Sequence, residues 1–388
     1  MTQPPLKIAI VAGEESGDLL GADLVRALRQ MSGRDVRLVG LGGRHLQGLG
    51  LSPLFNAGEI ALMGLSAILR DLPRLIRRIG ETARFVAAEK PDCLITIDSP
   101  DFSLRVARKV RALAPGIPIV HYVCPSVWAW RPGRAKAMRP HVDEVLCILP
   151  FEPKELARLD GPPGTYVGHR LTSDPGVLIA AAMQEHGSGP AEQGGEKTLL
   201  LLPGSRRSEV RALLGPFGET VSILKARGHR LRLLLPTVPH VANMVTSITG
   251  QWPDKPEIIL DAQKKWQAFG EADAALIASG TVSLELALAG VPMMSCYKLD
   301  AVMRMAQRLI TVWSASLPNL VADRTVVIEA YNEYVRPQWM ARHLEGLLTD
   351  SALRQWQKDG FAEVRRRFAT ERPSGELAAQ VVLKHIRK

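Results

Sequence analysis

Two glycine–serine turns in this sequence each connect an apolar run to a helical pattern. Leu199–Leu202 leads into Pro-Gly-Ser-Arg-Arg207, and Ala274–Ala278 leads into Ser-Gly-Thr281. A strand, a turn and a helix in this order leave backbone N–H groups unpaired at the helix start, where the helix dipole favours an anion. Either turn alone could simply be a tight turn. Together, and with a guanidinium beside them, they predict a diphosphate site that includes Ser205, Arg206, Gly280 and Thr281.

Glu285 lies one helical turn after Thr281 and could reach the diol of a ribose whose diphosphate is held by the two turns. Metal ligation is not expected, because the sequence has no Asp-x-Asp and no pair of histidines at ligand spacing. A departing diphosphate would then be stabilised by helix N-termini and arginine. The sequence therefore predicts no metal and no cofactor, and the nucleotide would be part of a substrate.

Carboxylates follow the first and third predicted strands. Asp98 comes directly after the third strand, where it is well placed to accept a hydroxyl proton as a general base. Glu14 and Asp101 are the alternative bases, although Asp101 could simply be the acidic residue that a helix start prefers. Ser16 and Asp18 lie close to Glu14. Here either Ser16 caps the helix, or the polar residues line a pocket for a hydroxyl-rich ligand.

A proline-broken loop follows His121 and carries Trp128, Trp130, Arg131 and Arg134. Two indoles and two guanidinium groups could stack on a sugar and grip a phosphate, or could fill an interface between domains. His121 itself is more typical of a strand-end histidine than of a catalyst.

The segment 59–79 is apolar and then basic. Its candidate membrane-contact residues are Leu62, Met63, Leu65, Ile68 and Leu69, and arginines follow at 70, 74, 77 and 78. A basic amphipathic helix can lie in an anionic membrane interface. The alternative is a helix that packs on a sheet and exposes a solvated basic face.

The composition is that of a soluble globular protein. The chain has 388 residues, 46% hydrophobic and 23% charged, which excludes wholesale disorder. Its net charge of +10 indicates an anionic partner, and nucleic acid is the weakest choice because aromatics are only 5% and do not interleave with basic runs. Four cysteines without metal spacing predict buried reduced thiols and a cytosolic protein. No signal peptide or membrane-spanning segment is expected.

Strands and helices alternate along the chain, which predicts two doubly wound α/β domains with sites at the strand C-termini. The predicted strands are 7–12, 36–40, 93–97, 117–123, 142–148, 198–202, 231–235, 257–260, 274–278 and 292–296. The main predicted helices are 17–30, 65–89, 101–113, 152–159, 207–227, 238–248, 281–289 and 301–311. The predicted domains are 1–168 and 197–335, joined by a flexible linker 169–196 that contains a helix near 175–186. C-terminal helices 336–388 are expected to pack back on the first domain, and this basic tail could also be exchanged between the subunits of a homodimer.

Taken in order, these motifs resemble those of the lipid-A-disaccharide synthases, inverting glycosyltransferases of family 19. The resemblance spans nearly the whole chain, and the combination is far more specific than any single motif. Glu15 and Ser99 depart from the usual pattern at positions to which no chemistry is assigned. The matching segments are Gly13-Glu-Glu-Ser-Gly-Asp18, Met63-Gly64, Ile97-Asp-Ser-Pro-Asp-Phe102, Pro125-Ser-Val-Trp-Ala-Trp130, Leu202-Pro-Gly-Ser-Arg206, Ser279-Gly-Thr281 with Glu285, Tyr297-Lys298 and Ser316-Leu-Pro-Asn-Leu320.

The resemblance implies a GT-B fold, in which two Rossmann-like domains face a cleft. It also implies that UDP-2,3-diacylglucosamine and 2,3-diacylglucosamine 1-phosphate give a β-1,6-linked disaccharide 1-phosphate and UDP, at the cytoplasmic face of the inner membrane of a Gram-negative bacterium. Asp98 would take the acceptor proton, Arg206 would hold the UDP diphosphate or the acceptor phosphate, and Glu285 would bind the ribose. Trp128 and Asn319 would bind substrate.

Two other functions fit the residues. One is a GT-B UDP-sugar epimerase that acts on soluble substrates, which would not need the amphipathic basic helix. The other is a membrane-surface or nucleic-acid-binding scaffold on an inactive nucleotide fold, whose affinity would fall with salt without release of UDP.

Overall fold

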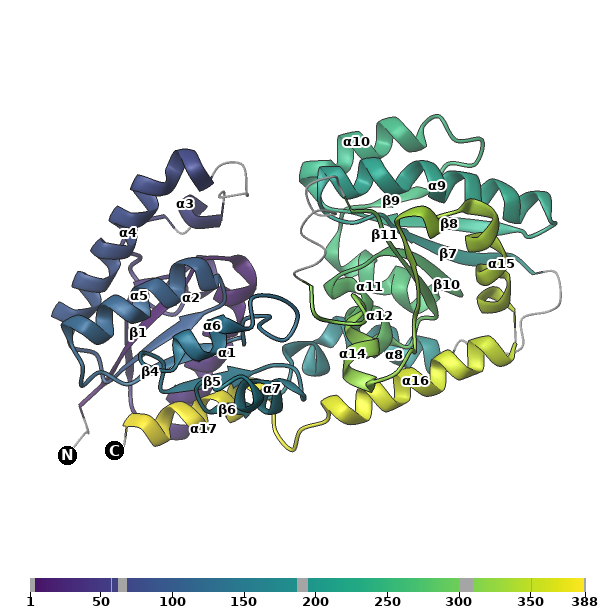
Figure 1. Ribbon diagram of the computed structural model, residues 1–388. Helices are drawn as coiled ribbons and strands as arrows, with labels where there is room; N and C mark the ends of the chain where they lie inside the picture. Colours follow the sequence, from purple (N-terminus) through teal and green to yellow (C-terminus); the bar gives the residue numbers. More distant parts are fainter. Residues whose placement is uncertain are drawn as a thin grey trace. The chain divides into compact units, whose positions relative to one another are not determined.

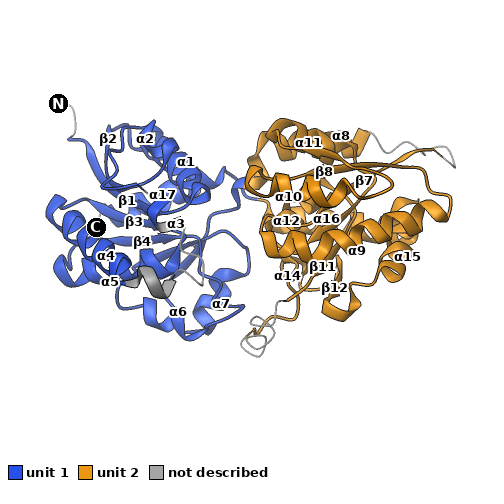
Figure 2. Ribbon diagram, turned by 90° about the horizontal axis from the view of Figure 1, so that it is seen from above, with its two compact units in different colours: residues 1–170, 370–388 blue, residues 171–369 orange. Residues whose placement is uncertain are grey.

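The computed structural model describes residues 4–56, 58–61, 68–186, 195–299, 310–349 and 351–386. The chain divides into two compact units, residues 1–170 with 370–388 and residues 171–369 (Figure 2). Each unit contains a six-stranded parallel sheet (Figure 1). The two predicted α/β domains are therefore confirmed.

The sheet of unit 1 has the strand order β2-β1-β3-β4-β5-β6. The elements of unit 1 are β1 (Leu6–Ala12), α1 (Glu15–Ser32), β2 (Val36–Leu41), α2 (Arg44–Gln47), α3 (Gly58–Ala61), α4 (Ile68–Glu89), β3 (Cys93–Ile97), α5 (Pro100–Leu113), β4 (Ile119–Tyr122), α6 (Gly133–Met138), β5 (Glu144–Cys147), α7 (Glu152–Arg158), β6 (Gly164–Tyr166) and α17 (Ser374–Ile386). The strand order reverses direction between β1 and β3, and ligands of open α/β sheets bind beyond such a point.

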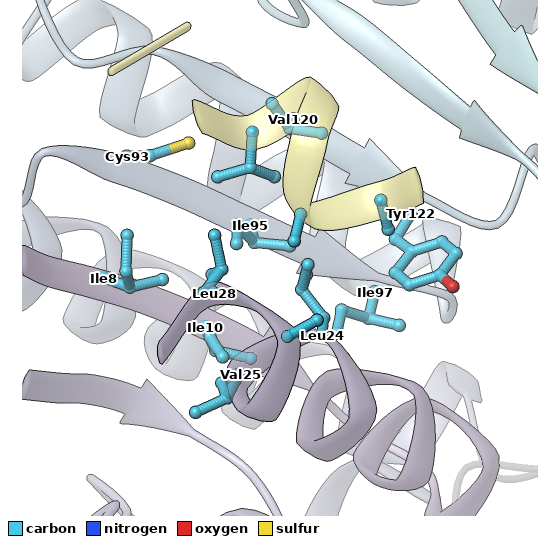
Figure 3. Packing of buried hydrophobic residues seen from close by; sticks show 14 of the residues in the cluster. Ile8, Ile10, Leu24, Val25, Leu28, Cys93, Ile95, Ile97, Val120 and Tyr122 are labelled. Carbon is cyan, nitrogen blue, oxygen red and sulfur yellow. The ribbon is translucent and has the colours of Figure 1, made fainter. Parts of the chain in front are cut away.

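Alternate residues of the unit 1 strands pack on opposite faces of the sheet, as the period of two requires. Ile8 and Ile10 belong to a core with α1 and α17, and Figure 3 shows these side chains gathered against Leu24 and Leu28. Ala9 and Val11 belong to the opposite core, with α4 and α5. The strands are thus buried on both faces, which is why they read as continuous apolar runs.

The sheet of unit 2 has the order β12-β11-β10-β7-β8-β9. The elements of unit 2 are α8 (Pro175–His186), β7 (Lys197–Leu202), α9 (Arg207–Ala226), β8 (Leu231–Pro236), α10 (Pro239–Thr249), β9 (Glu257–Ile259), α11 (Ala262–Glu271), β10 (Ala274–Ala278), α12 (Thr281–Ala289), β11 (Met293–Tyr297), α14 (Leu317–Ala322), β12 (Ile328–Tyr331), α15 (Pro337–Leu348) and α16 (Ala352–Phe368). This is the Rossmann order, and its reversal lies between β7 and β10.

The C-terminal helices do not all pack on the first domain. Helices α15 and α16 belong to unit 2, and only α17 belongs to unit 1 (Figure 2). The expected linker is also shorter than predicted, because α8 confirms the helix near 175–186 but packs within unit 2 against α11 and α12. Within the described ranges, no helix has the length and apolar character needed to cross a membrane. The four cysteines are buried free thiols, as predicted.

Candidate functional site

Unit 2 contains a cavity of about 480 Å³ at the carboxyl ends of β7, β8, β9 and β10. This position is the reversal point of the sheet, and the volume suits a small ligand. Both predicted glycine–serine turns line it, together with Glu285. The structure therefore brings Ser205, Arg206, Gly280, Thr281 and Glu285 to one cavity, as the sequence predicts.

The first turn requires a glycine at position 204. Gly204 has φ +103°, and a Cβ atom there would lie 2.3 Å from Glu209 Oε2. Glu209 in turn accepts hydrogen bonds from Arg206 N (3.2 Å) and from Arg206 Nη1 (2.7 Å). The Arg206 side chain is 77% exposed, and so exposed an ion pair is worth only about 0–1 kcal/mol. A phosphate could therefore compete with Glu209 for the guanidinium.

The second turn leads into α12 without a side-chain cap. Gly280 has φ +151° and directly precedes Thr281. Ser279 Oγ donates to the Ala315 carbonyl (3.0 Å), which fixes the turn to the loop before α14. Gly280, Thr281 and Val282 line the cavity, so the positive end of the α12 dipole lies at it, and no side chain caps this end.

Three residues that the sequence analysis missed also line or support this cavity. The Thr237 hydroxyl is buried and has no hydrogen-bond partner among the described residues. His240 Nε2 donates to the Ser205 carbonyl (2.8 Å), tying the first turn to α10. Lys265 Nζ forms an ion pair with Glu285 Oε2 (2.6 Å). Each contact joins different elements of the sheet edge, so sequence spacing could not reveal it.

Unit 1 gathers carboxylates at its own reversal point. Asp98 and Ser99 follow β3 with φ +51° and +43°, a left-handed conformation that costs non-glycine residues roughly 1–2 kcal/mol each. Asp98 Oδ1 accepts from Ser99 N (2.8 Å), and Oδ2 accepts no hydrogen bond from a described residue. Ser99 Oγ donates to Glu14 Oε1 (3.2 Å), which links the loops after β3 and β1. Backbone strain of this kind clusters at functional sites, so the local geometry is compatible with a base at Asp98 or Glu14.

Asp101 has a different environment from the other two candidate bases. Its Oδ1 lies 2.6 Å from Arg134 Nη2 and 3.8 Å from Arg131 Nη1. Two guanidinium groups thus already engage this carboxylate oxygen. Asp101 therefore fits a role in holding the loop 123–134, and its assignment as a base stays a prediction.

Asp18 is 2% exposed, and its carboxylate binds backbone N–H groups. Its carboxylate accepts hydrogen bonds from the N–H groups of Gly43 (2.7 Å), His45 (2.8 Å) and Leu46 (3.3 Å), at the start of α2. Ser16 does not cap α1, contrary to one of the two interpretations offered above, because α1 begins at Glu15 and Glu14 is the capping position. Ser16 is exposed near a cavity of about 450 Å³ that Glu14, Glu15 and Asp18 line.

The Trp128 indole is held by a buried glutamate, Glu152, which the sequence analysis overlooked. Trp128 Nε1 donates to Glu152 Oε1 (3.2 Å), and the indole meets the Phe151 ring edge to face at 5.1 Å. Glu152 Oε2 accepts from the N–H groups of Ile148 and Leu149, both at 3.0 Å. Burial raises the pKa of Glu152 to about 7, against the opposing effect of these donors. The indole of a predicted substrate-binding residue is thus oriented by a titratable group.

Trp130, Arg131 and His121, in or next to the same loop, can be compared with the sequence analysis. Trp130 is 40% exposed, and the Arg131 guanidinium lies 4.1 Å from its ring centre. Both side chains are therefore accessible to a ligand. His121 is fully buried and bonds Thr96 Oγ1 through Nδ1 (2.8 Å). Burial lowers its pKa to about 3, so it is neutral and matches the strand histidine that was expected.

Asn319 is 1% exposed, and its amide bonds within unit 2. Nδ2 donates to the Val327 carbonyl (2.9 Å), and Oδ1 accepts from the N–H groups of Val326 and Val327, both at 2.7 Å. Asn319 therefore fixes the connection between α14 and β12. Its predicted substrate contact stays a prediction.

Most of the predicted membrane-contact residues lie outside the described residues. Leu62, Met63 and Leu65 fall outside the described residues, and Ile68 and Leu69 are described only as backbone of α4. Further along α4, Arg74 and Arg78 bind Glu59 of α3 at 2.7 and 3.0 Å. Ile76 on the same helix is 51% exposed. The helical part of the prediction is confirmed from residue 68 onward.

Cys124, Cys147 and Glu152 form the one group of metal-ligating side chains found within the described ranges, with ligand atoms within 4.8 Å of one another. The contact with Cys124 and burial raise the pKa of the Cys147 thiol. The Glu152 carboxylate is also already committed to three N–H donors. All three side chains therefore have partners within unit 1.

The fold and the two sheet-edge sites define a class of proteins. The chain resembles the crystal structure of MurG from Acinetobacter baumannii with a TM-score of 0.61 over 98% of this chain and 100% of that one, at 14% identity. It resembles MnaA of S. aureus, solved with UDP, with a TM-score of 0.62 over 98% and 96%, at 15% identity. These likenesses show a GT-B fold, which confirms the predicted fold class and is shared by glycosyltransferases and epimerases.

Sequence comparison decides between these two enzyme types. A family profile described as lipid-A-disaccharide synthetase matches residues 8–382. A lipid-A-disaccharide synthase of Nitrobacter winogradskyi is 46% identical over 387 residues, covering 99% of this chain and 97% of that protein. Another, from Rhodospirillum centenum, is 40% identical over 388 residues, with 99% and 96% covered. The chain belongs to the lipid-A-disaccharide synthetase family. It is thus a glycosyltransferase of lipid A biosynthesis, and the epimerase alternative is disfavoured.

Proposed function

We propose that this glycosyltransferase transfers the sugar of UDP-2,3-diacylglucosamine to the 6-hydroxyl of 2,3-diacylglucosamine 1-phosphate, with inversion at the anomeric carbon. The observation that carries the proposal is the unit 2 cavity, in which Arg206, two helix starts and Glu285 meet at one sheet edge. A guanidinium and backbone N–H groups suit a diphosphate. The carboxylate of Glu285 suits a ribose diol.

In the proposed reaction, the acceptor 6-oxygen forms a bond to the anomeric carbon while the bond from that carbon to the β-phosphate oxygen breaks. Asp98 takes the acceptor proton, and UDP leaves with the bonding electron pair. Negative charge grows on the diphosphate as this bond breaks, so donors already oriented toward it lower the barrier. No metal is assigned to any step. Asp98 is preferred to Asp101 because Asp101 is held by two arginines.

The test is release of UDP by the full chain with both lipid substrates in detergent and excess EDTA. Release that requires the acceptor supports a metal-independent transfer. Release without acceptor would indicate hydrolysis, and no release from folded protein would refute the proposed reaction. Asp98→Ala is expected to slow acceptor-dependent release by roughly 10²–10⁴-fold while UDP still binds. Asp98→Asn serves as the near-isosteric variant.

We further propose peripheral attachment to the cytoplasmic face of the anionic inner membrane through α4 and the residues before it. The exposed side chains of Ile76, Arg74 and Arg77 on α4 support this proposal, because apolar and basic side chains together favour an anionic lipid surface. Replacing Leu65, Ile68 and Leu69 by serine should weaken flotation with anionic vesicles and leave UDP binding intact. Serines at Leu178 and Ile179, 53% and 58% exposed on α8, are the matched control. Equal flotation of both variants would contradict the proposal.

A further inference from the structure

An ion pair between α11 and α12 forms part of the wall of the unit 2 cavity. Lys265 Nζ lies 2.6 Å from Glu285 Oε2, and both residues line the cavity. The side chains are 29% and 17% exposed, respectively. Such partial burial strengthens the attraction relative to an exposed pair, because water screens it less.

The position of Lys265 is set by more than Glu285. Its ammonium lies 4.4 Å from the centre of the Trp266 ring and 5.3 Å from that of Phe269. These two rings pack edge to face at 5.3 Å. Asp261 caps the start of α11 by accepting from the N–H groups of Gln263 and Lys264. The ammonium is therefore held by a carboxylate, two aromatic rings and a capped helix, which favours a single rotamer.

The two oxygens of Glu285 differ in their contacts. Oε2 accepts from Lys265, whereas Oε1 accepts no hydrogen bond from a described residue. A bare carboxylate in this wall would repel a diphosphate held at the neighbouring turns. The ammonium compensates this charge and leaves Oε1 able to accept a hydrogen bond from a ligand.

We propose that Lys265 is a positioning residue: it holds Glu285 so that Oε1 accepts a hydrogen bond from a ribose hydroxyl, and the cavity thereby selects ribonucleotides over nucleotides that lack the diol. This inference rests on the proposed UDP site and adds the residue that gives the site its preference for ribose. Lys265 acts through Glu285 and need not touch the nucleotide.

The experiment compares binding of UDP with binding of 2′,3′-dideoxy-UDP to the full chain by calorimetry. A hydrogen bond to a charged acceptor predicts a preference for UDP of about tenfold to a hundredfold in the wild type. Glu285→Gln should reduce this preference to a few-fold. Lys265→Met, whose unbranched side chain lacks the charge, should reduce it similarly, and Lys265→Arg should retain most of it.

The double variant Lys265→Met/Glu285→Gln isolates the coupling. If Lys265 acts through Glu285, its removal should change the preference in the wild type and leave it unchanged in the Glu285→Gln background. Thermal unfolding shows whether each variant is folded. If Lys265→Met is not, Lys265→Arg and Glu285→Gln still test the ribose contact.

Three results would overturn the inference in distinguishable ways. Weaker binding of both nucleotides by Lys265→Met, with the preference intact, would mean that Lys265 contacts phosphate instead. A wild type that binds both nucleotides equally would remove the ribose contact while leaving the UDP site. A folded wild type that binds neither nucleotide would refute the donor site itself.

Discussion

Titration of Glu152 is expected to make the stability of the protein depend on pH, and Glu152→Gln should remove this dependence. Burial raises the pKa of the folded-state carboxyl from 4.5 to about 7. Between these two values the folded protein keeps a proton that the unfolded chain has released. Because the unfolded state then binds fewer protons, the free energy of unfolding falls as the pH rises through this window. The loss is complete above pH 7.

The size of the effect follows from the two pKa values. A shift from 4.5 to about 7 corresponds to roughly 3 kcal/mol in total, of which about 2.5 kcal/mol develops between pH 5 and pH 8. Glutamine cannot titrate, but its amide NH₂ group would face an N–H donor at a position where the carboxylate oxygen accepts a hydrogen bond. That mismatch costs about 1–3 kcal/mol at every pH. The test is therefore the change in unfolding free energy with pH, and not the constant difference in stability between the two proteins.

Urea unfolding of the wild type and of Glu152→Gln at pH 5 and pH 8 measures this difference. Between pH 5 and pH 8 the wild type should lose about 2.5 kcal/mol more than the variant, because the other titrating groups are common to both proteins. Trp128→Phe removes a donor that lowers the pKa of Glu152, so its pH dependence should extend to higher pH. Parallel pH dependences of wild type and Glu152→Gln would refute the reasoning.

Two further predictions concern the two sites, and a third concerns the connection between α14 and β12. Asp98→Ala should lower kcat by roughly 10²–10⁴-fold, the usual contribution of a general base, with UDP affinity unchanged, and steady-state kinetics with calorimetry would check both. Gly204→Ala should weaken UDP binding at least about tenfold, because the added Cβ would displace Glu209. The matched control is Gly228→Ala, since Gly228 has φ +94° and open space around it. Equal UDP affinities of the two variants would contradict the predicted clash. Asn319→Ala should cost at least about 2 kcal/mol of unfolding free energy, since it leaves two buried backbone N–H groups without an acceptor; an unchanged urea midpoint would contradict this.

The central strands could be predicted from sequence because they are buried on both faces and read as apolar runs. The edge strands β6 and β12 could not. Gly164–Tyr166 is only three residues long, and Ile328–Tyr331 is interrupted by Glu329. Helix α11 was also missed, because its start, Ala262-Gln-Lys-Lys265, is mostly polar. These elements depend on the sheet or the helices beside them more than on their own apolar content.

The two turns that line the unit 2 cavity were predictable, because strand, turn and helix are adjacent in sequence. The partners of the site residues were not. His240 meets Ser205 because the sheet order places β8, which leads into α10, beside β7, which leads into α9. Lys265 meets Glu285 because α11 packs against α12. Glu152 looks like an ordinary acidic residue at a helix start, and only the fold shows that it is buried beneath Trp128. Sequence spacing identifies the groups that could do chemistry, and strand order determines which groups hold them.

The two sites divide the requirements of glycosyl transfer between the units. Unit 1 presents carboxylates and a strained turn at its reversal point, as removal of a proton from an acceptor would need. Unit 2 presents a guanidinium and an uncapped helix start, as departure of a diphosphate would need. A site with both functions on one sheet edge would set carboxylates against the phosphates and weaken donor binding. The division predicts that substitutions in unit 1 change turnover more than UDP affinity, and that those in unit 2 change both. Lys265 applies the same electrostatic rule within unit 2, where it compensates the carboxylate that the ribose requires.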